Sequence, residues 1–353
     1  MLAAARRPVV LTESVGRDPG AFAALVAFAD ALGVGVVEPT SAVCSNFPRE
    51  HALHLGADPA AAGEPDLVLL VNCRAPWYPP SANPFPQAST VVIDEVPQRP
   101  HVVYQVLQAH AYLEGEVAST LDGLREEAAP RLAAGALERR RAELEAAHRR
   151  ELDAIAEDER RAGASGERIA PVLLAAALRE ALPPDAVLVD ETITHSRLLQ
   201  RHLQAGQAGR WIYVQGGLGQ GSGVALGVKL ALGERMVVLA LGDGTFLYNP
   251  IVPALMASRD LGLPLLVVIF NNRQYLSMKL NHLRFYPEGA AVANDDFDGV
   301  DLSGQPPLSE FAAPFGFSGR EVAEPEELRP ALEAAIAEVA AGASAVINVS
   351  LSR

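Results

Sequence analysis

The chain has 353 residues, of which 49% are hydrophobic, and a formal net charge of −14 at pH 7. This length leaves room for two α/β domains, and the negative charge, with no Lys/Arg-rich run, argues against a nucleic-acid partner. The two cysteines, Cys44 and Cys73, are too few for a disulfide framework or a zinc site, and the apolar runs are too short for a membrane span, so we expect a cytoplasmic protein with no membrane partner.

The N-terminal third alternates short apolar strands with a segment of helical spacing. The spacing predicts a helix over residues 19–32 and strands over 8–11, 33–37, 66–71 and 90–94. This alternation is typical of a parallel sheet with helical crossovers, so we expect residues 1–125 to form a central Rossmann-like domain. The turn after the first strand, residues 12–17, lacks the glycines of a dinucleotide site. That absence argues against a nucleotide-dependent dehydrogenase and against flavin binding.

Residues 126–164 are rich in Ala, Glu and Arg, and oppositely charged side chains recur three and four positions apart. Such pairs support a solvent-exposed helix, so we interpret this segment as a charged helical linker. We expect a second α/β domain over residues 165–353. The predicted fold class is therefore α/β, with two Rossmann-like domains whose mainly parallel sheets are flanked by helices.

Two polar or glycine-rich segments follow predicted strands in this second domain. The strand at 186–189 leads into DETITHS at 190–196, which contains His195. That histidine is either a proton-transfer residue or a side chain that only caps the turn. The glycine-rich run GGLGQGSG at 216–223 precedes an apolar helix at 224–232. Glycines there let backbone approach a ligand closely, although tight packing also uses glycine.

The most informative pair of motifs is Gly242-Asp243-Gly244 and Asn271-Asn272, each of which follows a buried apolar strand. The carboxyl ends of parallel strands share the sheet edge where ligands bind. Carboxylate and amide oxygens suit Mg²⁺, which commonly shares its coordination sphere with phosphates. Gly242 and Gly244 would let backbone close on phosphates, with the Gly244 N–H and the Thr245 hydroxyl as donors. Each motif alone is commonplace, but the spaced pair is much more specific.

This spaced pair resembles the cofactor motif of thiamin diphosphate-dependent enzymes, and the whole chain is similar to the acetolactate synthase and benzoylformate decarboxylase group. The resemblance implies thiamin diphosphate and Mg²⁺ as cofactors. It implies Asp243, the Asn272 side chain and the Gln274 carbonyl as metal ligands. Gly216 would accept a hydrogen bond from the aminopyrimidine, and Leu218 would be the apolar wedge under the cofactor. The implied cofactor-binding residues are Thr194, Gly216, Leu218, Gly242, Asp243, Gly244, Thr245, Asn272, Gln274 and Tyr275.

The resemblance also implies an activity and a partner. The implied reaction is decarboxylation of a small 2-oxo acid, ligation of the resulting acyl group to a second carbonyl, or both. A 2-hydroxyacyl-CoA lyase, an oxalyl-CoA decarboxylase type of enzyme and a non-catalytic thiamin diphosphate-binding regulatory subunit are the alternatives. Members of the group carry an activating glutamate on a pyrimidine domain that has no counterpart in these residues. We therefore expect a separate pyrimidine-domain subunit and a hetero-oligomer with two-fold symmetry.

Overall fold

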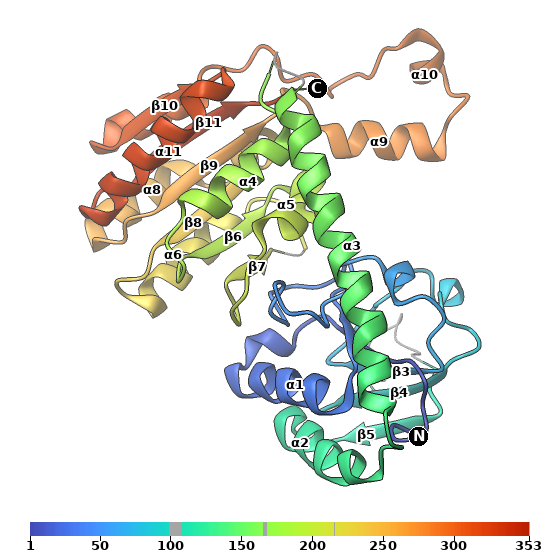
Figure 1. Ribbon diagram of the computed structural model, residues 1–353. Coiled ribbons are helices and arrows are strands. Elements are labelled where there is room, and N and C mark those ends of the chain that lie inside the picture. The colour runs from blue at the N-terminus through green and yellow to red at the C-terminus, as the bar shows by residue number, and fades with distance from the viewer. Residues whose placement is uncertain (99–107, 165–167, 215, 353) are drawn as a thin grey trace. The chain divides into compact units, whose positions relative to one another are not determined.

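The computed structural model describes residues 1–98, 108–164, 168–214 and 216–352. Contacts divide the chain into two compact units, Met1–Glu157 with Gln204–Trp211, and Asp158–Leu203 with Ile212–Arg353. Each unit contains a parallel sheet flanked by helices (Figure 1), so the predicted fold class is confirmed. The division falls within the charged helix α3 (Ala136–Ala164), and the predicted domain start at residue 165 lies outside the described residues.

The N-terminal unit has a five-stranded sheet in the order β2-β1-β3-β4-β5. All of its neighbouring strands run parallel, and the predicted strands and helix are confirmed with small differences at their ends. Helices α1 and α2 pack against each other. The elements are β1 (Pro8–Thr12), α1 (Pro19–Leu32), β2 (Gly35–Val37), β3 (Leu67–Val71), β4 (Ser89–Asp94), β5 (Ala111–Glu114) and α2 (Val117–Ala128).

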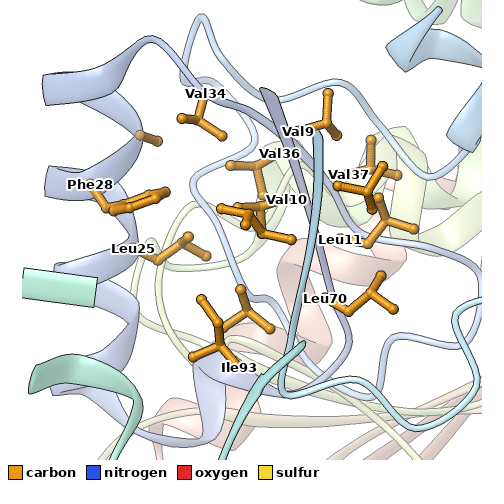
Figure 2. Close-up of a cluster of buried hydrophobic side chains, with 14 of the residues drawn as sticks. Val9, Val10, Leu11, Leu25, Phe28, Val34, Val36, Val37, Leu70 and Ile93 are labelled. Carbon is orange, nitrogen blue, oxygen red and sulfur yellow. The ribbon is translucent and has the colours of Figure 1, made fainter. Parts of the chain in front are cut away.

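Local sequence signals set the limits of α1 and the core that it covers. The Asp18 side chain caps the helix by accepting the Gly20 N–H at 2.7 Å, and Gly33 ends it with a left-handed φ of 62°. Figure 2 shows Leu25 and Phe28 of α1 directed toward the buried valines of the sheet. These β-branched residues suit a strand buried on both faces.

The C-terminal unit has a six-stranded sheet in the order β10-β11-β9-β8-β6-β7. Helices α6 and α8 pack together, as do α4 and α11. No helix within the described ranges has the length and apolar character that crossing a bilayer requires. The strands are β6 (Val187–Glu191), β7 (Trp211–Tyr213), β8 (Val237–Gly242), β9 (Leu266–Asn271), β10 (Ser318–Val322) and β11 (Ala345–Ser350). The helices are α4 (Pro171–Ala181), α5 (Ser196–Leu203), α6 (Gly221–Leu232), α7 (Asp243–Tyr248), α8 (Ile251–Leu261), α9 (Leu276–Phe285), α10 (Ala290–Asn294) and α11 (Pro325–Ala340).

The register of this sheet brings three strand ends together at one edge. Strand β8 pairs in parallel with β6 on one side and with β9 on the other, and Glu191 lies opposite Leu241 while Gly242 lies opposite Phe270. The residues that follow these strands therefore emerge side by side, as ligand-binding residues do in open α/β sheets. Asp243 and Gly244 form the first turn of α7.

Candidate functional site

Asp243 occupies the centre of this sheet edge. Asp243 is only 2% exposed, and one oxygen of its carboxylate, Oδ2, has no hydrogen-bond partner among the described residues. Burial raises the pKa of Asp243 to about 6, although hydrogen bonds from the Gly244 and Arg273 backbone and the Gln305 side chain oppose the rise. A buried carboxylate with an unpaired oxygen is costly unless a cation or a donor meets it. The carboxylate is therefore suited to bind a metal ion.

The neighbouring strand β9 supplies the amides. Asn272 is buried, and its Oδ1 accepts the Gln274 N–H at 3.0 Å. The Gln274 carbonyl accepts the Leu276 N–H at 2.9 Å, and a carbonyl oxygen has a second lone pair. Arg273 lies between them with a positive φ of 58°, so that Asn272 and Gln274 belong to one turn after β9, while the third predicted ligand, Asp243, is the first residue of α7.

Gln305, which the sequence reasoning missed, bridges the two motifs. Its Nε2 donates to Asn271 Oδ1 at 3.0 Å, and its side chain lies close enough to Asp243 to lower the pKa of that carboxyl group. Its Oε1 is buried and has no hydrogen-bond partner among the described residues. A glutamine in a loop far along the chain carries no local sequence signal, so only the fold reveals this contact.

The glycine of α7 and the tyrosine after β9 fit closely against each other. A Cβ on Gly244 would lie 2.5 Å from Tyr275 Cε1, so only glycine allows this approach. The Thr245 hydroxyl lies 3.0 Å from the Glu191 carbonyl oxygen and 2.8 Å from the Gly242 carbonyl oxygen. The hydroxyl proton is therefore directed at these carbonyl oxygens, and only the lone pairs of the hydroxyl oxygen remain free, as hydrogen-bond acceptors.

The glycine-rich loop before α6 presents an apolar side chain to the exterior. Leu218 is 42% exposed, and its neighbours Gly216 and Gly219 have left-handed φ values of 119° and 89°. Glu191, at the end of β6, accepts backbone N–H groups of this loop and a hydrogen bond from Asn249. Neither Glu191 nor Asn249 was predicted, because a polar residue at a strand end or after a short helix has many ordinary uses.

His195 is brought to the predicted metal edge, whereas Thr194 has a less defined position. The His195 Nε2 lies 3.5 Å from Asn272 Nδ2, and its ring lies 5.9 Å from that of Phe270. Burial lowers the pKa of His195 to about 4, so the ring is neutral near pH 7. Thr194 is half-buried in the middle of a short 3-10 turn, Ile193–His195, whose first residue has a positive φ of 56°.

The donor set favours a hard cation over a transition metal. Among the described residues, no three His, Cys, Asp or Glu side chains gather into a metal-binding group. A cation at this edge would be held by one carboxylate, by amide and carbonyl oxygens of the protein, and by oxygens of a bound phosphate group. This set of oxygen donors suits Mg²⁺.

Residues 192–349, which hold all the predicted site residues, match the family described as thiamine pyrophosphate enzyme, C-terminal TPP binding domain. Over these residues the C-terminal unit is therefore similar to the C-terminal TPP binding domains of thiamine pyrophosphate enzymes. Thiamine pyrophosphate is another name for thiamin diphosphate, so the resemblance to the acetolactate synthase and benzoylformate decarboxylase group is confirmed.

Curated relatives and solved structures are consistent with this domain. The acetolactate synthase large subunit of Parasynechococcus marenigrum is 31% identical over 157 residues, which are 44% of this chain and 24% of that protein. Benzoylformate decarboxylase of Pseudomonas aeruginosa is 27% identical over 313 residues, which are 85% of this chain and 53% of that protein. The thiamine diphosphate-dependent 4-hydroxybenzoylformate decarboxylase of Rhodococcus jostii shares the fold with a TM-score of 0.75 and 21% identity, covering 99% of this chain and 62% of that one.

The share of this chain that aligns differs between these relatives. The match to the acetolactate synthase is confined to under half of this chain, whereas the two decarboxylases align with most of it. In every one of these comparisons the chain spans less than two thirds of the relative's own length.

Proposed function

We propose that the sheet edge formed by β6, β8 and β9 binds thiamin diphosphate together with Mg²⁺. The single observation that carries this proposal is the buried Asp243 carboxylate, whose Oδ2 has no hydrogen-bond partner among the described residues at the start of α7. Asp243, the Asn272 side chain and the Gln274 carbonyl would hold the metal. Gly242 and Gly244 would approach the diphosphate, with Tyr275 packed behind Gly244. The Thr245 hydroxyl would donate to the diphosphate only by giving up its bonds to the Glu191 and Gly242 carbonyls.

The remaining predicted residues would contact or support the thiamin part of the cofactor. Leu218 is an exposed apolar side chain in a loop of glycines, as a wedge under a heterocycle requires. Gly216 and Thr194 lie in the flanking segments. We assign His195 to positioning, because its neutral ring nitrogen lies where it accepts a hydrogen bond from the Asn272 amide. That contact would turn the Asn272 oxygen toward the metal.

The proposed reaction is decarboxylation of a 2-oxo acid, with or without ligation of the product to a second carbonyl. When bound, thiamin diphosphate supplies a carbon nucleophile and an electron sink for the loss of CO₂. The chain's own share is to bind and orient this cofactor at a buried edge. Similarity to a benzoylformate decarboxylase over most of the chain supports the decarboxylase assignment.

We also propose that a pyrimidine domain outside these 353 residues completes the site. The resemblance assigns the activating glutamate to such a domain. Glu191, the buried glutamate at this edge, is already bonded to four N–H groups, so it is not free to activate a cofactor. The partner would therefore provide the glutamate and much of the substrate pocket, within a hetero-oligomer of two-fold symmetry.

Calorimetric titration of the purified chain with thiamin diphosphate tests the cofactor assignment. We expect saturable binding in the presence of Mg²⁺, loss of binding after chelation of the metal, and loss of binding in Asp243→Ala. The exposed Asp260→Ala, in α8 of the same unit, serves as the control and should bind normally. Equal affinity of wild type and Asp243→Ala for thiamin diphosphate would contradict the proposed function.

A further inference from the structure

The carboxylate of Glu191 joins β6 to the start of α6. The residue is 1% exposed. Its Oε1 accepts the N–H groups of Gly219 and Gln220 at 2.8 and 3.0 Å, and its Oε2 accepts the Gly221 N–H at 3.0 Å. Charge-assisted hydrogen bonds of this kind are among the stronger ones in proteins. The loop before α6 is thus bonded at three successive residues to one buried side chain.

Asn249 extends this connection to the predicted metal site. Its Nδ2 donates to Glu191 Oε2 at 2.7 Å and to the Thr245 carbonyl at 2.8 Å, while its Oδ1 accepts the Ser222 N–H at 2.9 Å. The Thr245 hydroxyl in turn lies 3.0 Å from the Glu191 carbonyl oxygen. One network therefore links the glycine-rich loop, β6 and the first turn of α7, which begins with Asp243.

The packing around the network leaves little room for the loop to move. A Cβ on Gly219 would lie 2.5 Å from the Tyr248 carbonyl oxygen, and one on Gly221 would lie 2.6 Å from Glu191 Oε2. The bonded residues begin directly after Leu218, the exposed apolar side chain. The network consequently fixes the base of the loop while it leaves the Leu218 side chain directed outward.

The network also occupies the N-terminus of α6. The N–H groups of Gln220, Gly221 and Ser222, which are three of the free donors at this helix start, are all bonded to Glu191 or Asn249, as is the preceding Gly219 N–H. A diphosphate at this edge would have to displace the Glu191 carboxylate in order to use them. These donors at the start of α6 are therefore unavailable to the diphosphate, in contrast to what the glycine-rich sequence suggests.

We infer that Glu191, assisted by Asn249, is a positioning residue for the glycine-rich loop. By holding the loop it places Leu218 against the thiamin rings, and it takes no part in binding the diphosphate. This inference rests on the proposed cofactor. It separates the site into two parts, because the diphosphate and Mg²⁺ depend on Asp243 and the β9 turn, whereas the rings depend on the loop that Glu191 holds. A change at Glu191 should therefore affect thiamin diphosphate and inorganic diphosphate differently.

The experiment compares Glu191→Gln with wild type in the full chain. Glutamine has nearly the same shape, but its amide nitrogen would face donors where the carboxylate accepts, so part of the network is lost. Glu321→Gln is the matched control, since Glu321 accepts hydrogen bonds from the Ser309 backbone and side chain and from Asn348 in β11 of the same unit. Asn249→Ser, which removes only the amide donors and acceptor, is the second variant should Glu191→Gln fail to fold.

Hydrogen–deuterium exchange in the cofactor-free chain is the first measurement. We expect faster exchange over residues 216–222 in Glu191→Gln and Asn249→Ser, with exchange in β8 and β9 unchanged and Glu321→Gln like wild type over this loop. Unchanged exchange over 216–222 would overturn the inference. This measurement needs no cofactor, so it decides the role of Glu191 in holding the loop even if wild type bound no thiamin diphosphate and the proposed function failed.

Calorimetric titration with two ligands, each with Mg²⁺, is the second measurement. Glu191→Gln should bind thiamin diphosphate about tenfold more weakly and inorganic diphosphate as tightly as wild type. Equal weakening for both ligands would show a general structural loss and overturn the positioning role. Tighter binding of inorganic diphosphate would show that α6 is an anion site that Glu191 blocks, which also overturns the assignment of the diphosphate to Asp243 and the β9 turn.

Discussion

Asp243 illustrates at the scale of one residue how binding and stability oppose each other. Its carboxylate is buried with Oδ2 unpaired among the described residues, an arrangement that weakens the metal-free fold and favours a cation. We expect Asp243→Asn to lower the affinity for thiamin diphosphate with Mg²⁺ on the order of 100-fold. The same change should leave the metal-free chain at least as stable as wild type, because a neutral amide costs less to bury than a carboxylate.

Titration calorimetry and thermal unfolding check this pair of effects. A metal-free Asp243→Asn chain that unfolds well below wild type would show that the carboxylate is a structural residue instead. Asp260→Asn, an exposed carboxylate of α8, should change neither the affinity nor the unfolding temperature.

A buried charged cluster in the N-terminal unit should make its stability depend on pH. Glu38 Oε2 lies 3.3 Å from Arg49 Nη2 and 3.1 Å from His54 Nε2. Burial lowers the pKa of His54 from its ordinary value of 6.5, and Glu38 opposes this. Burial alone would raise the pKa of Glu38, but Arg49 and His54 hold it below the ordinary value of 4.5. The folded unit therefore contains a neutral His54 beside an ionised Glu38.

Acid should consequently destabilise this unit in two steps. Below pH 6.5 the unfolded chain protonates His54 but the folded chain does not, so stability should fall by up to about 1.4 kcal/mol per pH unit. A further loss should follow below pH 4.5, where unfolded Glu38 takes up a proton that the folded residue resists. Urea unfolding followed by tryptophan fluorescence measures the effect. Trp77 lies in this unit, and Trp211, the first residue of β7, has the Arg49 guanidinium of the cluster 5.9 Å from its ring centroid. His54→Gln should flatten the first step, and an unchanged pH slope would contradict this explanation.

The individual site residues differ in how far sequence predicts them. Asp243 and Asn272 follow strands of unmistakable apolar character, and the structure places them at one sheet edge as predicted. Glu191, Asn249 and Gln305 gave no signal, because the partners that join them to other elements lie between 27 and 58 positions away in the chain. Contacts at such separations depend on how the strands are ordered, which local patterns do not encode.

At the scale of elements, two glycines at the starts of helices have different roles. A Cβ on Gly244 in α7 would lie 2.5 Å from Tyr275, whereas a Cβ on Gly223 in α6 meets no atom within 4 Å. Gly244→Ala should therefore lower the free energy of unfolding by about 1–3 kcal/mol. Gly223→Ala should raise it by about 0.5–1 kcal/mol, because alanine loses less entropy in a helix. Urea unfolding followed by circular dichroism distinguishes them, and equal effects of the two changes would refute the close contact with Tyr275.

Helix α9 should be the first helix of the C-terminal unit to open. No residue of α9 or α10 is buried, and Figure 1 shows both helices beyond the edge of the sheet. Elements with few buried contacts open at low free-energy cost. Limited trypsin digestion should therefore cleave after Lys279 and Arg284 of α9 before it cleaves after Lys229, which is buried in α6 and hydrogen-bonded to Arg235. Earlier cleavage at Lys229 would argue against this order.

At the scale of the whole molecule, the proposed site is divided between chains. The proposed metal and diphosphate edge lies within the described residues, and the proposed activating glutamate would lie on a pyrimidine domain of another chain. We expect the purified chain to bind thiamin diphosphate with Mg²⁺ and to release no CO₂ from benzoylformate or other 2-oxo acids. Adding a pyrimidine-domain polypeptide should restore CO₂ release, and Asp243→Ala should abolish it again. Turnover by the chain alone would refute the requirement for a partner.

The sequence by itself determined the α/β class, the chain order of the strands and the identity of the Asp243 and Asn272 motifs, because apolar runs and glycine turns are local properties. Only the tertiary structure decided that α7 begins at Asp243, that Glu191 binds N–H groups at the start of α6, and that Gln305 lies beside both motifs. The physical reason is that these features depend on which strands are neighbours. A hydrogen bond forms between groups that the sheet order brings together, whatever their separation in the chain.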